Sequence, residues 1–223
     1  MHWAVIFDMD GVIIDSEPSH WTVNKRIFTA LGMDISESEY QQYIGTSNTN
    51  MWTSLKQQYN LSQEVSDLVA MQVNGNIAYM ETEEIPQVKG VVQLIGELSS
   101  NRIPLAIASS SPYRIIDMVV SGFNIRNNFS AIVSGEDFEH GKPAPDIFLK
   151  ASQLLNVVPK LCIVIEDSTH GVTAAHAAGM HCVGLKNKNS GNQNLIGADI
   201  IINDFSELSI QILQQLATCH KNE

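Results

Sequence analysis

Two aspartates directly follow the first apolar run of this 223-residue sequence. The run is Trp3–Phe7, and Asp8, Asp10 and Gly11 come after it. Carboxylates this close together at the end of an apolar strand repel each other, which is costly unless a cation or a shared proton compensates. The pattern therefore favours a chemical role for Asp8 and Asp10 over a polar turn.

Further polar residues lie where later apolar runs end. Glu166 and Asp167 follow one such run, Ser109 follows another, and Lys142 lies in a Gly-Lys-Pro loop before a helical segment. In open α/β sheets, ligands bind outside the carboxyl ends of the strands. Separated carboxylates with a lysine and a hydroxyl suit a hard cation such as Mg²⁺, with a phosphoryl group beside it.

Each of these residues alone has an ordinary structural explanation. The acidic pair at Glu166 could be a solvated turn, Ser109 a turn hydroxyl and Lys142 a surface lysine. Their joint occurrence, each at a strand end or loop, favours one common site.

The elements that must position these residues alternate along most of the chain. Short apolar runs are followed by turn residues and then by helical patterns, which is typical of a parallel sheet covered on both faces. We therefore predict an α/β, Rossmann-like core. A Ser111 cap should open one helix, and Ser168 should open another that ends near Gly179. The six predicted strands are Trp3–Phe7, Ile103–Ala108, Ala131–Val133, Leu161–Ile165, His181–Leu185 and Ile200–Ile202.

One stretch interrupts this alternation. Residues 16–85 contain helical patterns without a strand-like run, so we predict an inserted α-helical cap domain there, with residues 1–15 and 86–223 forming the core. The hinges are expected near Asp15–Pro18 and Ile85–Gln87, about which the cap would close as a lid. The predicted cap helices are a first helix, which has Trp21, Phe28 and Leu31 on one face and is ended by Gly32, and then Ser36–Tyr43, Asn48–Tyr59 and Ser62–Met80.

Composition narrows the possible partners. Thirteen basic residues against twenty-four acidic ones give a net charge of −11, and no run of Lys or Arg occurs. Binding to nucleic acid or to an anionic membrane is therefore not expected. No targeting signal or membrane span is recognisable, and Cys162 and Cys182 read as buried free thiols, so we expect a cytoplasmic protein. A monomer is expected.

Four segments resemble the motifs of the haloacid dehalogenase superfamily, and the helical insert resembles the cap of its β-phosphoglucomutase-like branch. The resemblance covers nearly the whole chain. It implies an enzyme acting on a small phosphate ester with Mg²⁺ as cofactor. The four segments are Phe7-Asp8-Met9-Asp10-Gly11-Val12, Ala108-Ser109-Ser110-Ser111, Gly141-Lys142-Pro143-Ala144-Pro145-Asp146 and Ile165-Glu166-Asp167-Ser168.

The resemblance implies a role for each aspartate of the first motif. Asp8 corresponds to the nucleophile that forms an aspartyl-phosphate, and Asp10 to the general acid/base that protonates the leaving alcohol and then activates water. Superfamily members that remove halide do not need a second aspartate there, because no leaving alcohol requires a proton. The presence of Asp10 therefore favours phosphoryl chemistry.

The other motifs correspond to anion-binding and metal-binding groups. Ser109, Ser110 and Lys142 are expected to hold the phosphoryl oxygens. Mg²⁺ is expected to bind Asp167, the Asp8 carboxylate and the main-chain carbonyl of Asp10. Glu166 is expected to support the metal through water. In the cap, His20 and Lys25 match positions of the mutase-like members and are candidate substrate contacts, although exposed helix positions would explain both.

Hydrolysis is expected rather than isomerisation of a sugar phosphate. A mutase needs a second anion site, which resembles Gly-x-Ser-Arg in its cap, whereas this sequence has Gly45-Thr46-Ser47-Asn48. Between residues 16 and 85 there are three basic residues and nine acidic ones. A phosphosugar mutase remains the alternative, because Lys25 or Arg26 could rebuild a weaker site.

A phospho-accepting signalling module also combines acidic residues, a hydroxyl and a lysine on a parallel sheet. Such modules are shorter, lack a helical insert after the first strand and have no use for Asp10 as an acid/base. The sequence therefore favours the enzyme.

Overall fold

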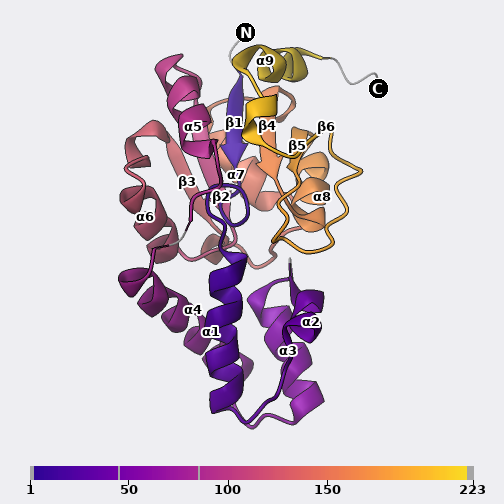
Figure 1. Ribbon diagram of the computed structural model, residues 1–223. Helices are drawn as coiled ribbons and strands as arrows, with labels where there is room; N and C mark the ends of the chain where they lie inside the picture. The colour runs from indigo at the N-terminus through magenta and orange to yellow at the C-terminus, as the bar shows by residue number, and fades with distance from the viewer. Residues whose placement is uncertain (1–2, 45, 85, 220–223) are drawn as a thin grey trace. The chain divides into compact units, whose positions relative to one another are not determined.

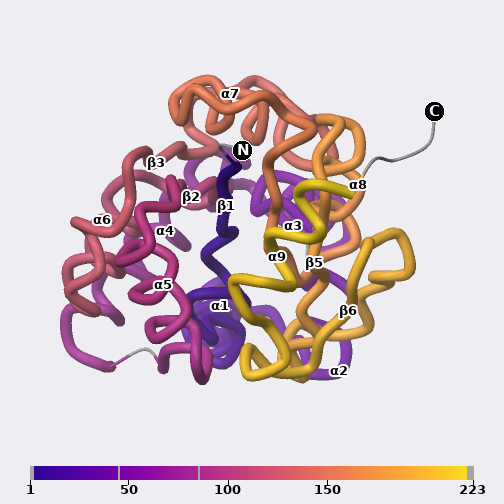
Figure 2. Tube along the Cα trace, turned by 90° about the horizontal axis from the view of Figure 1, so that it is seen from above, coloured from indigo at the N-terminus to yellow at the C-terminus, as the bar shows by residue number. Residues whose placement is uncertain are grey.

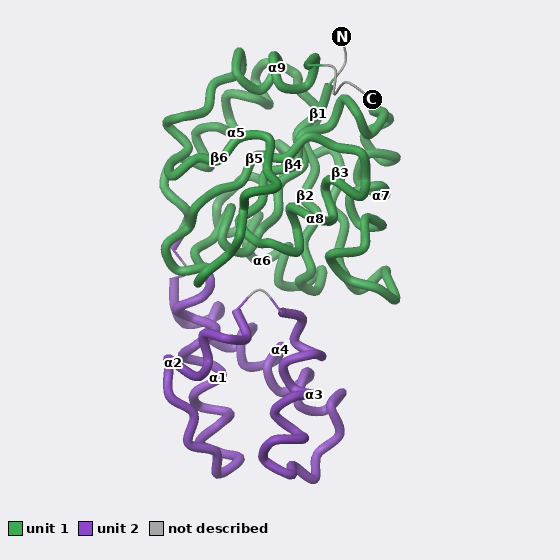
Figure 3. The backbone as a smooth tube through the Cα atoms, turned by 90° about the vertical axis from the view of Figure 1, so that its right-hand side faces the viewer, with its two compact units in different colours: residues 1–15, 87–223 green, residues 16–86 purple. Residues whose placement is uncertain are grey.

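The computed structural model describes residues 3–44, 46–84 and 86–219 of the chain. These residues form two compact units, which are coloured separately in Figure 3. Unit 1 comprises residues 1–15 and 87–223, and unit 2 comprises residues 16–86. The predicted second hinge includes Ile85, which lies outside the described residues.

Unit 1 is built on a six-stranded parallel sheet in the order β3-β2-β1-β4-β5-β6 (Figure 1). The first strand therefore lies inside the sheet, between the second and the fourth, and the connections run outward from it in both directions. The predicted α/β core is confirmed. The strands are β1 Ala4–Phe7, β2 Leu105–Ser109, β3 Ala131–Ser134, β4 Cys162–Glu166, β5 His181–Leu185 and β6 Ile200–Ile202.

Helices cover both faces of this sheet, which explains why its central strands are apolar throughout. All four residues of β1 are buried, and alternate ones face opposite sides. Ala4 and Ile6 belong to a core cluster with residues of α7 and α8, including Phe148 and Val172. Figure 2 shows α5 on the opposite side of the sheet from α7. The α-helices of unit 1 are α5 Val91–Ser100, α6 Tyr113–Gly122, α7 Asp146–Leu155, α8 Thr169–Ala177 and α9 Ile210–Thr218.

The cysteines of unit 1 are free thiols. Cys162 and Cys182 are buried and unbridged, as predicted, and Cys219 is exposed.

Short 3-10 turns complete unit 1. The 3-10 turns are η2 Arg126–Asn128, η3 Gly135–Asp137, η4 Pro159–Leu161 and η5 Phe205–Glu207.

One predicted helix cap is confirmed and another is wrong. The Ser168 side chain accepts a hydrogen bond from the Gly171 N–H and opens α8, and Gly179 follows its end with a positive φ of 72°. Helix α6 instead begins at Tyr113, with Pro112 at the cap position. Ser111 does not cap it, because its hydroxyl donates to a carboxylate oxygen of Asp10.

Unit 2 is a small helical bundle with its own core. Phe28 and Trp52 are almost fully buried and meet edge to face at 5.7 Å between ring centroids. The predicted segment Ser36–Tyr43 is a short α-helix followed by a 3-10 turn, and Ser47 caps α3 by accepting from the Asn50 N–H. The helices are α1 Glu17–Ala30, α2 Glu37–Tyr40, η1 Gln41–Tyr43, α3 Asn48–Tyr59 and α4 Val65–Thr82.

The chain segments that lead out of unit 1 and back into it lie side by side. Ile14 and Gln87 form an antiparallel bridge, and the Val88 N–H donates to the Ile13 carbonyl at 3.0 Å. Among the described residues, no helix has the length and apolar character needed to cross a membrane.

Candidate active site

The first aspartate is held by the sheet itself. Although β1 ends at Phe7, the Asp8 N–H still donates to the Ile165 carbonyl of β4 at 3.0 Å. The chain then turns sharply, with the Gly11 N–H donating to the Ile14 carbonyl at 2.7 Å and Gly11 at a φ of 77°. A positive φ favours glycine, so the turn after Asp8 depends on this residue.

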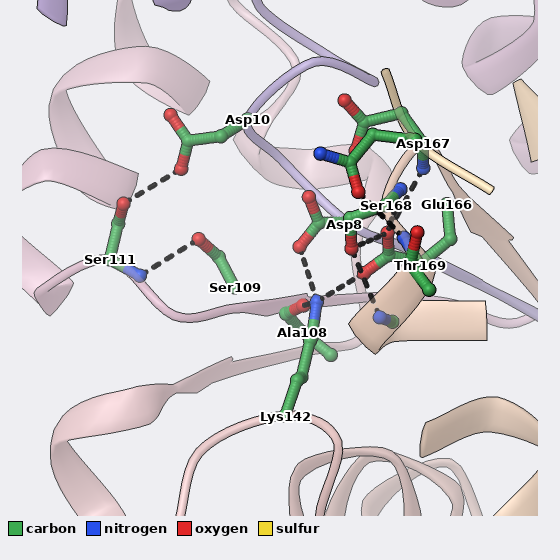
Figure 4. A network of polar contacts seen from close by, with 12 residues as sticks. Asp8, Asp10, Ala108, Ser109, Ser111, Lys142, Glu166, Asp167, Ser168 and Thr169 are labelled. Atoms are coloured by element: carbon green, nitrogen blue, oxygen red, sulfur yellow. Dashed lines mark hydrogen bonds and ion pairs between the residues drawn. The ribbon is translucent and has the colours of Figure 1, made fainter. Parts of the chain in front are cut away.

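Lys142 joins the carboxylates of two neighbouring strands (Figure 4). Its Nζ lies 2.5 Å from Oδ1 of Asp8 and 2.7 Å from Oε1 of Glu166, and it donates to the Ala108 carbonyl at 3.2 Å. The same Nζ lies 4.8 Å from the centre of the Phe148 ring. The ammonium group is thus surrounded by acceptors and an aromatic face, and the Lys142 side chain is only 7% exposed.

Glu166 is fixed at the N-terminal end of α8. Its Oε2 accepts from the N–H groups of Asp167 and Ser168, at 3.0 and 2.9 Å, and from the Ser168 hydroxyl at 2.9 Å. A Cβ on Gly171 would lie 1.8 Å from the Glu166 carboxyl group. Glycine at this helix position therefore leaves the space that the carboxylate occupies, and helix N-terminal N–H groups stabilise its negative charge.

Asp167 completes a cluster of three buried carboxylates. One oxygen from each of Asp8, Glu166 and Asp167 can be chosen so that all three lie within 4.8 Å of one another. Asp167 also accepts a hydrogen bond from the Ser190 hydroxyl. All three residues are more than nine-tenths buried, so their charges are poorly screened by water.

The electrostatics of this cluster are unbalanced. Burial raises the pKa of Asp8 to about 7; Lys142 opposes this, whereas Glu166 and Asp10 add to it. Burial also raises the pKa of Asp167 well above its ordinary value, with further contributions from Glu166 and Asp8. For Lys142, burial alone would lower the pKa, but Asp8 and Glu166 outweigh burial and raise it. Three acids therefore share one ammonium group.

A divalent metal ion fits this donor set. A divalent cation would supply the positive charge that the three carboxylates lack, and oxygen ligands are those that Mg²⁺ prefers. Burial first, and then the neighbouring carboxylates, raise the pKa of both aspartates, and a bound cation would favour their ionised forms. The expected ligands Asp8 and Asp167 thus come together with Glu166, which is expected to support the metal through water. The Asp10 side chain is not part of this trio, and metal binding by its main-chain carbonyl stays a prediction.

Asp10 and the loop formed by Ser109, Ser110 and Ser111 lie beside the carboxylate cluster. The Ser111 hydroxyl donates to Oδ2 of Asp10 at 2.8 Å, and the Ser111 N–H donates to the Ser109 hydroxyl at 3.0 Å. Ser109 is fully buried at the end of β2, whereas Ser110 is exposed. Figure 4 shows Ser109 between the Asp10–Ser111 pair and Asp8.

Comparison with known proteins identifies the family. Residues 5–185 match the family described as haloacid dehalogenase-like hydrolase. The chain belongs to this family. The predicted membership and the prediction of an enzyme of this hydrolase class are therefore confirmed.

This haloacid dehalogenase-like hydrolase is similar to several known proteins. It is 30% identical over 217 residues to Hexitol phosphatase B of Escherichia coli strain K12, covering 94% of this chain and 96% of the relative. It is 32% identical over 188 residues to Protein SUPPRESSOR OF QUENCHING 1, chloroplastic, of Arabidopsis thaliana, which is 82% of this chain but only 18% of that protein. The solved β-phosphoglucomutase of Clostridium difficile aligns with a TM-score of 0.82 and 26% identity, covering 97% of each chain.

Two expected substrate contacts of the hydrolase lie on α1 of unit 2. His20 is partly exposed, with its Nδ1 3.9 Å from Glu17, and Lys25 is exposed with its Nζ 5.6 Å from the Trp21 ring centre. Their role toward a substrate stays a prediction.

Sequence reasoning missed two serines that support the site. Ser111 bonds Asp10, and Ser190 bonds Asp167. Ser111 carried a signal, since it lies in the serine motif, but its helix-cap pattern pointed to a different role. Ser190 lies outside every recognised motif, and its partner precedes it by 23 residues.

Proposed function

We propose that this protein is a Mg²⁺-dependent phosphatase that hydrolyses small phosphate monoesters of the sugar-phosphate class through an aspartyl-phosphate on Asp8. The observation that carries the proposal is the buried cluster in which Lys142 bonds Asp8 and Glu166 beside Asp167, with Asp10 adjacent. The similarity over nearly the full length to Hexitol phosphatase B supports the substrate class.

In the first step, the Asp8 carboxylate attacks phosphorus and the ester oxygen leaves. Asp10 gives its proton to that oxygen, so a neutral alcohol departs. Asp8, Asp167 and the main-chain carbonyl of Asp10 would hold Mg²⁺, with Glu166 supporting it through water, and the ion would offset the charge of the phosphoryl group. Lys142 adds a fixed ammonium group against the attacking carboxylate, since its Nζ already lies 2.5 Å from Oδ1 of Asp8.

In the second step, Asp10 takes a proton from water, which attacks the phosphorus of the aspartyl-phosphate. The acyl–phosphate bond breaks, inorganic phosphate leaves and the Asp8 carboxylate is restored. The Ser111 hydroxyl at 2.8 Å from Oδ2 of Asp10 would keep that carboxyl group oriented through both transfers. Ser109 and Ser110 are proposed to bind phosphoryl oxygens.

The cap composition favours hydrolysis over phosphosugar mutation. Each basic residue of unit 2 contacts a group of unit 2 itself: Lys25 faces the Trp21 ring, Arg26 lies 6.0 Å from the Tyr79 ring centre, and Lys56 pairs with Glu64 at 3.2 Å. Asn48, at the position expected for a mutase arginine, is the exposed first residue of α3. These contacts support a cap without a strong second phosphate site.

The mutase is the second candidate, because the fold matches a β-phosphoglucomutase closely. Supplying β-glucose 1-phosphate, Mg²⁺ and a trace of glucose 1,6-bisphosphate separates the two. A phosphatase releases free phosphate as the main product. Glucose 6-phosphate forming much faster than free phosphate would establish the mutase instead.

The test of the phosphatase is hydrolysis of p-nitrophenyl phosphate and a panel of sugar and polyol phosphates, with Mg²⁺ and with EDTA. Asp8→Asn should abolish turnover, because it removes the nucleophile with little change in volume. Asp117→Asn, an exposed residue of α6, is the matched control and should retain full activity. Mg²⁺-dependent turnover by Asp8→Asn would exclude Asp8 as nucleophile.

The cytoplasmic location and monomeric state expected from the sequence belong to the same proposal. So do the roles of His20 and Lys25 as substrate contacts, and closure of the cap. A lid would exclude water from the aspartyl-phosphate until Asp10 activates one molecule.

A further inference from the structure

A turn outside the four motifs touches the carboxylate cluster. Residues 187–190 follow β5, and we refer to them as the 187–190 turn. Ser190 is 4% exposed, and its hydroxyl donates to Oδ2 of Asp167. A buried serine hydroxyl that binds one carboxylate oxygen fixes the rotation of that carboxyl group.

Gly11 confines the same carboxylate. A Cβ built on Gly11 would lie 1.8 Å from Oδ2 of Asp167 and 2.9 Å from the Ser190 hydroxyl oxygen. The Asp167 carboxyl group therefore lies against the Gly11 backbone and also accepts from Ser190. These contacts restrict how Asp167 can present an oxygen to a metal.

The 187–190 turn is itself anchored to the loop that follows Asp8. The Ser190 N–H donates to the Asn187 carbonyl at 3.2 Å, and the Asn189 N–H donates to the Asn187 side chain at 2.9 Å. Nδ2 of Asn187 then donates to the Gly11 carbonyl at 3.0 Å. Asn187 thus connects the turn to the loop that carries Asp10.

The turn also binds the last residue of the first segment of unit 1. Nδ2 of Asn189 donates to Oδ2 of Asp15 at 2.6 Å, and Nδ2 of Asn187 lies 3.4 Å from Oδ1 of the same carboxylate. The whole segment from Gly11 to Asp15 is therefore held at both ends by side chains of one turn.

We propose that Ser190 is a positioning residue that orients Asp167 for Mg²⁺ binding, and that Asn187 holds the turn in place. The proposal rests on the metal site of the proposed function. Mg²⁺ requires nearly ideal octahedral geometry, so a carboxylate that rotates freely is a poorer ligand than one held by a hydrogen bond. Groups that orient metal ligands typically change metal affinity by ~10–100-fold when they are removed.

The experiment is calorimetric titration of the metal-free full chain with MgCl₂, comparing wild type with Ser190→Ala, Asn187→Ala and Ser152→Ala. Ser152 is the matched control: it is 3% exposed and its hydroxyl donates to the Val157 carbonyl at 2.6 Å, away from the carboxylates. Ser190→Ala should weaken Mg²⁺ binding by ~10-fold or more, and Asn187→Ala should weaken it by a smaller factor. Ser152→Ala should bind as the wild type does.

Thermal melting in EDTA shows whether each variant is folded before titration, and Asn187→Ala carries the test if Ser190→Ala does not fold. Steady-state kinetics give a second readout, in which Ser190→Ala should raise the Mg²⁺ concentration for half-maximal rate but leave the KM for p-nitrophenyl phosphate unchanged at saturating Mg²⁺. Wild-type affinity in the folded serine and asparagine variants would overturn the positioning role alone. A wild type that binds no Mg²⁺ would overturn both the metal site and this inference.

Discussion

Replacing Lys142 with methionine should make the stability of the protein depend more strongly on Mg²⁺ than that of the wild type. The side chain is 7% exposed and donates to Asp8, Glu166 and the Ala108 carbonyl. Methionine preserves most of the length and the contact with Phe148 but removes the charge. Three buried carboxylates would then remain without a cation.

The size of the effect follows from these contacts. Removing one partner of a buried ion pair typically costs about 3–5 kcal/mol, because the other charge is left uncompensated. Lys142 has two such partners, so Lys142→Met in EDTA at pH 7.5 should lose at least that amount of unfolding free energy. Saturating Mg²⁺ should restore part of it, since the ion would bind the same carboxylates.

The loss of unfolding free energy caused by Lys142→Met should also be smaller at acidic pH. Lys142 lowers the pKa of Asp8, so its removal raises that pKa above the present value of about 7. At pH 5 Asp8 would then be protonated in the folded variant, and the cluster would carry less negative charge.

Urea unfolding followed by circular dichroism, at pH 5 and 7.5 with EDTA or Mg²⁺, measures these differences. Lys150→Met, at an exposed position of α7, is the control and should change stability by less than about 0.5 kcal/mol. A loss below about 1 kcal/mol in EDTA, or a loss that neither Mg²⁺ nor pH alters, would refute the reasoning about this cluster.

Three further outcomes are expected. Asp10→Asn should bind Mg²⁺ in calorimetry yet lower kcat by ~10²–10⁴-fold on substrates with poor leaving groups; near wild-type rates would exclude Asp10 as acid/base. Gly171→Ala should lower the unfolding free energy in urea by about 1–3 kcal/mol, because the new Cβ would overlap the Glu166 carboxyl group. The control Gly96→Ala in α5, whose Cβ would meet nothing within 4 Å, should not destabilise the protein. The metal-free wild type should lose stability as pH rises, because the pKa of Asp8 is raised by folding from 3.8 to about 7: its contribution is complete below 3.8 and is lost on passing through 7. Unfolding curves of the metal-free wild type that coincide at pH 4, 6 and 8 would contradict this predicted pH dependence.

The sequence predicted the sheet because each strand carries its own signal. Runs such as Val5–Phe7 and Ile163–Ile165 are apolar at every position, since both faces of a parallel sheet are covered. The order of the strands in the sheet cannot be read from any single apolar run. It depends on how the connecting segments pack on the sheet, and it places β4 beside β1 although about 150 residues separate these two strands.

The carboxylates of the site were predictable for a similar reason. Asp8, Glu166 and Asp167 follow their strands directly, so the register of β1 against β4 brings them together. Ser190 and Ser111 could not be assigned in this way. A serine in a turn has many local partners, and the bonds that these two make cross 23 and 101 residues of sequence.

The bridge between Ile14 and Gln87 affects how easily residues 16–86 could be replaced by a different inserted domain. The segments that flank residues 16–86 lie side by side in the core. An insert is therefore compatible with this core if its first and last residues lie close together. The entropy of closing such a loop grows with the logarithm of its length, so doubling the insert would cost only about 0.6 kcal/mol. We therefore expect inserts of different size and sequence to be tolerated between the same two residues, while the strands that carry the carboxylates stay unchanged.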